Sequence, residues 1–88
     1  MYESLLAKVD HDSALAKVLV DTEVLPTAAR EGLIASFEAE WSRVSTGLPN
    51  GTELWWFREG KGALGRREGV VAIRGCRVLR ASTLLEDN

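Results

Sequence analysis

The sequence is short of the residues that most often build covalent or metal-based sites. Its 88 residues include a single cysteine, Cys76, and a single histidine, His11. One cysteine excludes an internal disulfide and every zinc site made of several cysteines. Proteins of reducing compartments such as the cytoplasm generally lack disulfides, so we expect a cytoplasmic protein.

Long apolar runs are also absent. No stretch approaches the roughly 20 apolar residues that a membrane-spanning helix needs, and the first residues lack the basic start and apolar core of a signal peptide. The composition, with 45% hydrophobic and 27% charged residues, is that of an ordinary folded domain. We therefore predict a small soluble protein with no membrane partner.

The charges divide unevenly along the chain. Residues 1–50 carry four basic and eight acidic side chains, whereas residues 51–88 carry seven basic and five acidic ones. The asymmetry is compatible with internal complementarity, self-association or an anionic partner. Ordinary surface charge on two kinds of secondary structure explains it equally well.

The first 20 residues have the apolar spacing of helices. A helix over residues 2–9 would carry its apolar side chains on one face: Tyr2, Leu5, Leu6 and Val9. Residues 13–18 nearly repeat residues 4–9, and an offset of nine turns the apolar face by about 180° on one straight helix. We favour two short helices with a break at residues 10–12, while a single helix over residues 2–20 is the alternative.

Residues 10–12, Asp-His-Asp, are the one segment with the composition of a metal or acid–base site. Consecutive residues do not face one another on a helix, and there is no second histidine to complete a metal site. Asp is a preferred residue at helix starts. We predict that Asp10 or Asp12 caps the second helix.

A longer helix is predicted from about Thr27 to Val44, with Pro26 at its start. Its apolar stripe has spacings of three and four residues and consists of Leu33, Ile34, Phe37, Trp41 and Val44. Gly32 in the interior costs about 1 kcal/mol relative to alanine, which suggests close packing at that point. The stripe is the natural cover for one face of a sheet.

Residues 53–59 form the aromatic strand that precedes the glycine-rich connection. Alternation along a strand puts Leu54, Trp56 and Arg58 on one face and Trp55 and Phe57 on the other. Both faces therefore need cover. The Gly60, Gly62 and Gly65 spacing resembles a dinucleotide fingerprint, but a strand-like segment follows it where a helix is required.

Residues 68–74 and 77–85 are predicted to pair as a hairpin with Gly75-Cys76 as its two-residue turn. This register pairs Arg74 with Arg77, Ile73 with Val78 and Ala72 with Leu79. It places the following on one face: Val71, Ile73, Val78 and Arg80. The other face carries Val70, Ala72, Leu79 and Ala81. Cys76 has no neighbouring activator in the sequence, so a catalytic thiol is not expected.

The C-terminal half contains three short segments of note: Glu-Leu-Trp at residues 53–55, Gly-Arg-Arg-Glu-Gly at residues 65–69, and Ser-Thr-Leu-Leu at residues 82–85 before a terminal Asn88. In these segments it resembles a group of small bacterial proteins for which no activity is known. The resemblance covers residues 53–88 and implies a strand, a hairpin and a final strand. The chain departs from that pattern at Gly75-Cys76, where the group has Asp-Gly.

These elements predict an α+β fold in which two or three N-terminal helices pack on one face of a C-terminal three-stranded antiparallel meander. We expect a single domain over residues 1–88. Its helical half is residues 1–46, its sheet half residues 53–85, and its disordered tail residues 86–88. A domain of this size buries a modest but sufficient core.

The leading functional hypothesis is a non-catalytic module that binds another protein or forms a homodimer. A lone meander covered on one side leaves an apolar face, and such patches usually mark interfaces. The candidate interface consists of Trp55, Phe57, Val71, Ile73 and Val78. A candidate anion contact consists of Arg66, Arg67, Arg74 and Arg77.

Two alternatives remain from the sequence. Aromatic and basic side chains on a sheet can stack single-stranded nucleic acid, although the acidic pI of about 5.4 disfavours this. A small apolar-ligand pocket or an enzyme is the other. We predict no catalytic residue, no metal site and no cofactor, because no nucleophile–base pair, metal set or phosphate loop is present.

Overall fold

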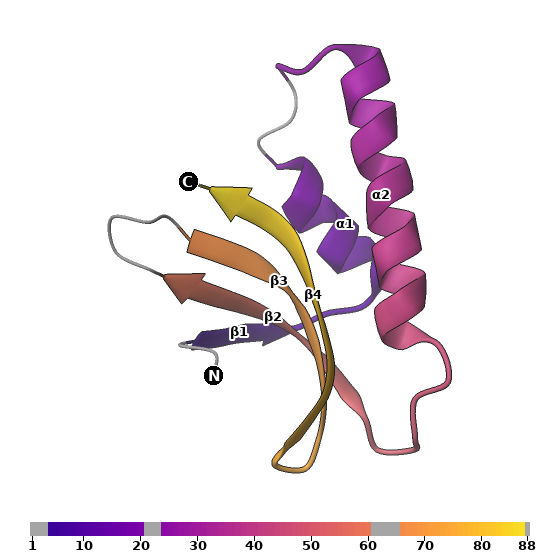
Figure 1. Ribbon diagram of the computed structural model, residues 1–88, viewed down its shortest axis with the longest axis vertical. Coiled ribbons are helices and arrows are strands. Elements are labelled where there is room, and N and C mark those ends of the chain that lie inside the picture. The colour runs from indigo at the N-terminus through magenta and orange to yellow at the C-terminus, as the bar shows by residue number, and fades with distance from the viewer. Residues whose placement is uncertain (1–3, 21–23, 61–65, 88) are drawn as a thin grey trace.

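The computed structural model describes residues 4–20, 24–60 and 66–87 as two helices over an antiparallel sheet (Figure 1). In chain order the elements are β1 (Ser4–Lys8), α1 (His11–Leu19), α2 (Thr27–Ser45), β2 (Glu53–Gly60), β3 (Arg66–Arg74) and β4 (Arg77–Asp87). The four strands are adjacent in sequence order, β1-β2-β3-β4. The α+β class is confirmed, but the sheet has four strands where the sequence predicted three.

The fourth strand, β1, is formed by the segment that was predicted as the first helix. The prediction of a helix there is wrong. β1 pairs antiparallel with β2, with Leu5 opposite Phe57 and Lys8 opposite Trp55, and the Val9 N–H donates to the Leu54 carbonyl at 2.9 Å. A short apolar run fits a strand or a helix equally well. The free edge of β2 decides the matter, because it satisfies backbone groups that a short isolated helix would leave unpaired.

α1 begins as predicted after Asp10. The Asp10 carboxylate accepts a hydrogen bond from the Ser13 backbone N–H at 2.8 Å, and the Ser13 hydroxyl accepts one from the Asp10 N–H at 2.9 Å. This reciprocal pair satisfies two backbone donors at the helix start. It directs Ala14 and Val18, both buried, toward the sheet.

α2 confirms the predicted long helix, and Phe37 and Val44 of its apolar stripe are buried. Gly47, with a φ of +73°, follows its end, which is the conformation that favours glycine after a helix. The expectation of close packing at Gly32 is wrong. Apart from the backbone of α2 itself and the two chain neighbours, no heavy atom of the described residues lies within 4 Å of the position that a Cβ would take there.

The hairpin of β3 and β4 has the predicted turn, with Gly75 at a φ of +63°. The predicted pairs Arg74–Arg77 and Ile73–Val78 are present, but beyond them the register shifts at Leu79. Ala72 therefore pairs with Arg80, and Val71 pairs with Ala81. The residues of β3 lie on the faces that were predicted for them. In β4, the residues beyond Val78 lie on the opposite faces from those predicted.

The shift has a clear structural effect, because it turns Arg80 toward α2. The Arg80 guanidinium donates to the carbonyl of Arg43 at 3.0 Å and to that of Thr46. These carbonyls lie at the helix C-terminus, where intrahelical partners run out. A bulge in a strand thus supplies the cap of a helix, which sequence periodicity does not encode.

A second shift lies between Glu68 and Gly69, opposite Leu84. It brings Leu84 against the core beside the helices. β4 then continues to Asp87, with Glu86 opposite Arg67 and Asp87 opposite Arg66. The strand therefore passes the predicted end at residue 85, and only residue 88 of the expected tail lies outside the described residues.

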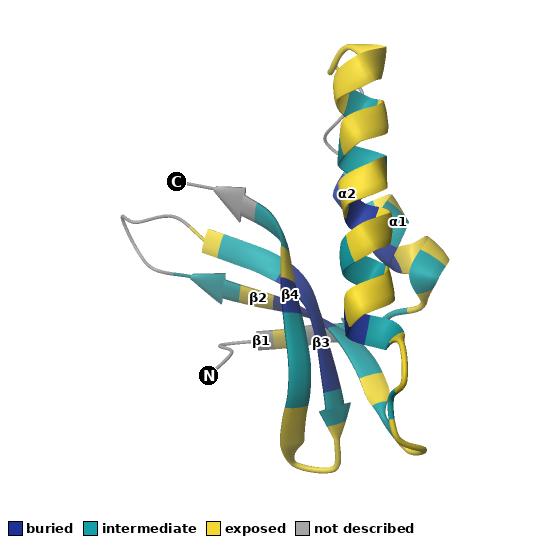
Figure 2. Ribbon diagram, turned by 45° about the vertical axis from the view of Figure 1, so that its right-hand side comes forward, coloured by how far each residue is buried: buried dark blue, intermediate teal, exposed yellow. Residues whose placement is uncertain are grey.

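Both helices lie on the same side of the sheet (Figures 1 and 2). The strands of the hairpin curve so that their convex side faces the helices. We call this side the helix face; Trp56, Val70 and Ala72 are buried there against α1 and α2. The opposite side is called the open face. It carries Leu5, Trp55, Phe57, Val71, Ile73 and Val78 according to the strand register.

Candidate functional site

The open face brings together the five residues of the predicted interface. Trp55 lies opposite Val71, and Ile73 lies opposite Val78, so these side chains form two adjacent rows across three strands. Phe57 and Val71 are buried within the chain itself. Trp55 and Ile73 are half-buried, and Val78 is 46% exposed.

The sequence missed one member of this face. Leu5 lies opposite Phe57 on β1 and is 43% exposed. It was assigned to a helix, so no pattern placed it beside the aromatic strand. The apolar surface of the open face therefore runs from β1 to β4, the two outer strands, which is about 14 Å at the usual strand spacing.

Two pairs of oppositely charged side chains lie on the described part of the open face. Lys8 Nζ lies 2.6 Å from Glu53 Oε2, and Arg67 forms an ion pair with Glu59. The hydrogen bond from Lys8, followed by one from the Trp55 indole, holds the pKa of Glu53 below its usual value. Each charge of these pairs is therefore balanced close to the apolar surface.

The four predicted anion-binding arginines do not meet at one place. Arg66 and Arg67 begin β3, whereas Arg74 ends it and faces Arg77 across the hairpin turn. The two pairs therefore lie at opposite ends of this strand of nine residues, whose extended length is about 26 Å. Arg67 belongs to the open face, and Arg66 borders a cleft on the helix face.

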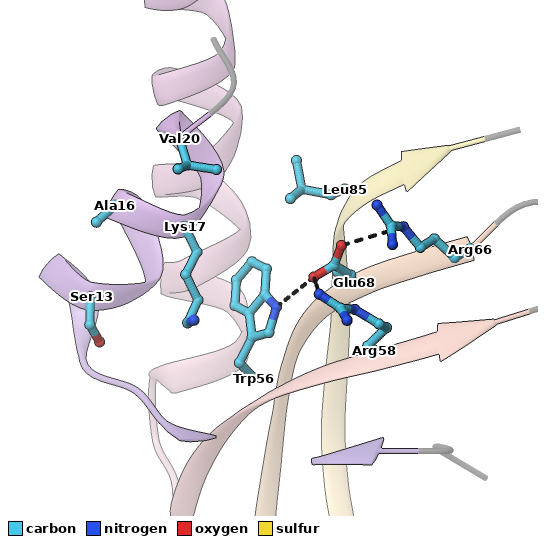
Figure 3. Close-up of a pocket in the computed structure, with 9 residues that line it drawn as sticks. All are labelled: Ser13, Ala16, Lys17, Val20, Trp56, Arg58, Arg66, Glu68 and Leu85. Atoms are coloured by element: carbon cyan, nitrogen blue, oxygen red, sulfur yellow. Dashed lines mark hydrogen bonds and ion pairs between the residues drawn. The ribbon is translucent and has the colours of Figure 1, made fainter. Parts of the chain in front are cut away.

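This cleft, of about 530 Å³, lies between α1 and the outer ends of β2, β3 and β4 (Figure 3). The helical side supplies Ser13, Ala16, Lys17 and Val20. The sheet side supplies Trp56, Arg58, Arg66, Glu68 and Leu85. The cleft unites segments that are up to 72 positions apart, because Ser13 and Leu85 both line it.

Glu68 connects the cations of the cleft with its buried floor. Its Oε1 accepts a hydrogen bond from the Trp56 indole N–H at 3.0 Å. The guanidiniums of Arg58 and Arg66 approach its carboxylate at 3.6 and 3.8 Å. Lys17 Nζ lies 5.7 Å from the centre of the Trp56 ring, within the range of a cation–π contact.

His11 holds α1 against α2. Its Nδ1 lies 3.0 Å from an Asp12 oxygen and its Nε2 lies 2.5 Å from Glu38 Oε1, while its ring packs edge-on against Phe37 and Trp41. A neutral imidazole donates from one nitrogen only, so two carboxylate partners favour the imidazolium. The hydrogen bonds to Asp12 and then Glu38 raise the pKa of His11 above 6.5.

This arrangement gives a pH dependence of defined sign. Because the pKa of His11 is higher in the folded than in the unfolded chain, its stabilisation is complete below pH 6.5 and is lost as the pH rises through the folded value. We expect the unfolding free energy to fall as the pH rises above 6.5, and to level off once His11 has lost its proton in the folded chain as well. Urea denaturation across this range measures the effect, and proton NMR of the single histidine reports its pKa.

His11→Gln is the matched variant for that measurement, because it keeps a polar side chain but does not titrate. The variant should lose the histidine-dependent part of the pH profile. An unchanged profile in His11→Gln would show that other groups govern this pH range.

Within the described ranges, no three His, Cys, Asp or Glu side chains are grouped as a metal site. Neither described helix is both long and apolar enough to cross a bilayer. Cys76 is exposed at the hairpin turn. Gly62 and Gly65 of the glycine-rich fragment lie outside the described residues.

Comparison of the chain with protein-family models, with curated proteins and with solved structures found no match.

Proposed function

We propose that the chain is a non-catalytic binding module that forms a homodimer through its open face. The observation that carries the proposal is the exposure of Leu5 and Val78, at 43% and 46%, on a sheet face that the described helices do not cover. Burying apolar surface of this kind is worth about 25 cal/mol per Å². Association is the direct way to gain that energy.

The charges of the open face support a second copy of the chain as the partner. The Lys8–Glu53 and Arg67–Glu59 pairs balance each other's charge beside the apolar residues. A strongly acidic or basic partner would gain little from these paired charges, whereas two identical faces that carry them can meet without strong repulsion. A contact of standard size takes about 800 Å² from each partner, roughly a seventh of the 5731 Å² of accessible surface.

The same geometry disfavours single-stranded nucleic acid. Strand alternation puts Trp55 and Phe57 on the open face, but Arg58 and Arg66 border the cleft on the helix face. Arg80 is engaged with carbonyls at the end of α2. Stacking platforms need aromatic rings and cations along the same groove, and these arginines lie on the other side of the sheet.

Val78→Lys tests the proposed dimer. A lysine on the open face would place two unpaired charges in the symmetric contact, so we expect the dimer to dissociate at least tenfold more readily, which is about 1.4 kcal/mol. Size-exclusion chromatography with light scattering over a concentration series gives the oligomeric state of each protein.

Val24→Lys is the matched control, because Val24 is 90% exposed between the helices and away from the sheet. It should associate like the parent chain. A parent chain that remains monomeric at high concentration would contradict the proposal. So would a Val78→Lys variant that dimerises as strongly as Val24→Lys while both keep their fold by circular dichroism.

A further inference from the structure

The cleft on the helix face combines features that the proposed dimer does not use. Its volume of about 530 Å³ lies in the range of about 300 to 1,000 Å³ that is typical of small-molecule sites. It lies beside α1 and on the opposite side of the sheet from Val78, according to its lining residues and the strand register. A ligand in the cleft would therefore leave the open face available.

Three cations from three different elements border the cleft. They are Lys17 of α1, Arg58 of β2 and Arg66 of β3 (Figure 3). Among the described lining residues Glu68 is the one acidic side chain, so these residues carry a formal charge of +2. Charges of one sign in a concave surface with apolar walls attract a counter-ion more strongly than the same charges on a flat surface.

Glu68 lies near both arginines but does not form short hydrogen bonds with their guanidinium groups. Its ion-pair distances of 3.6 Å to Arg58 and 3.8 Å to Arg66 exceed the range of about 2.7 to 3.2 Å for a good hydrogen bond. Each guanidinium carries five N–H donors. The carboxylate itself is held by the Trp56 indole N–H, so it fixes the position of charges whose donors can serve another acceptor.

Apart from Ser13, the remaining described wall is apolar. Ala16 and Val20 line the helical side and Leu85 the sheet side, above the buried ring of Trp56. Val20 is 65% exposed, which leaves apolar surface that a ligand would remove from water. The cleft thus presents cations and an apolar wall within one cavity.

We propose that the cleft binds a small amphipathic anion, with a carboxylate or phosphate group on an apolar body. The anionic group lies between Arg58 and Arg66 within reach of Lys17, and the apolar body lies against Val20 and Leu85. A neutral apolar molecule would leave the cations unbalanced. A small inorganic anion would leave the apolar wall exposed.

Two amphipathic probes and two partial probes test this proposal by isothermal titration calorimetry. Decanoate and decyl phosphate carry both features, decanol lacks the charge, and acetate lacks the apolar body. We expect decanoate or decyl phosphate to bind at least tenfold more tightly than decanol and acetate, and the tighter of the two identifies the anionic group. The Trp56 indole N–H signal should shift in nitrogen–proton NMR spectra, because its hydrogen-bond partner Glu68 faces the ligand.

Single substitutions locate the binding site. Lys17→Gln and Arg66→Gln should each weaken binding of the preferred probe by roughly tenfold, the effect of losing a charge-assisted contact. Arg77→Gln removes the same charge at the hairpin turn and should leave the affinity unchanged. Val78→Lys disrupts the proposed dimer and should also bind the probe normally, so failure of one proposal is distinguishable from failure of the other.

Four results would overturn the assignment. Absence of binding by both amphipathic anions would show that the cleft is not a ligand site of this class. Equal binding of decanol would show that the cations contribute nothing. An equal loss in Arg77→Gln would indicate attraction by net charge, and a loss in Val78→Lys would place the probe on the open face.

Discussion

Replacement of Trp56 by alanine is expected to lower the unfolding free energy by about 3 to 5 kcal/mol, the usual cost of truncating a buried aromatic residue. Trp56 is 1% exposed and heads the fully buried side chains by volume. Its loss would open a cavity between the sheet and the helices. It would also remove the indole N–H from the largely buried Glu68 carboxylate. Since small domains have only about 5 to 15 kcal/mol of stability in total, the variant should be close to unfolding.

Trp55→Ala is the matched control for that experiment. The two tryptophans are adjacent in sequence, but Trp55 lies half-buried on the open face. Its truncation should cost less than half as much, because water already reaches part of its ring. Urea denaturation followed by circular dichroism compares both variants without relying on tryptophan emission. Equal losses would contradict the assignment of the two faces.

Gly69→Ala is expected to destabilise the fold by about 3 kcal/mol, the upper part of the range for overpacking. A Cβ at this position would lie 2.0 Å from the Ser82 carbonyl oxygen and 3.0 Å from the Leu84 nitrogen. Both are backbone atoms of β4, so no side-chain rotation relieves the clash. The strand would have to move away at the irregularity that brings Leu84 into the core.

Gly32→Ala is the corresponding control and should change stability in the opposite direction. A Cβ there meets nothing within 4 Å, and the residue is exposed within α2. The variant should gain about 1 kcal/mol, because alanine favours the helix over the unfolded chain. Thermal and urea denaturation of both variants measure the difference. A neutral Gly69→Ala would show that β4 relaxes at this position at little cost.

Local sequence signals were sufficient for the elements whose stability is largely local. α2 followed from its apolar stripe, α1 from the cap at Asp10, and the hairpin turn from Gly75. β1 was not predictable in this way, because its short apolar run, Leu5 and Leu6, fits a helix as well as a strand. Only the pairing with β2, some 50 residues later, distinguishes a strand there.

The open face and the cleft also differ in how far local sequence signals predict them. Period-two alternation placed Trp55 and Phe57 together, so most of the open face was predictable from one strand and one hairpin. The cleft depends on the pairing of Arg58 with Glu68 and on α1 lying over that pair. Lys17 gave no signal of its own in the sequence. Contacts between distant segments assemble the cleft, and no local spacing encodes them.

The irregular edge of β4 has a consequence for how copies of the chain can assemble. β4 is an outer strand of 11 residues. An edge of this length, if it were regular, could pair with strands of other molecules and extend the sheet without limit. Register shifts at two places break the regular row of backbone donors and acceptors, and such bulges twist a strand edge away from pairing. Growth of the sheet from copy to copy is thereby hindered. Face-to-face contact remains, and a twofold contact of that kind closes after two chains.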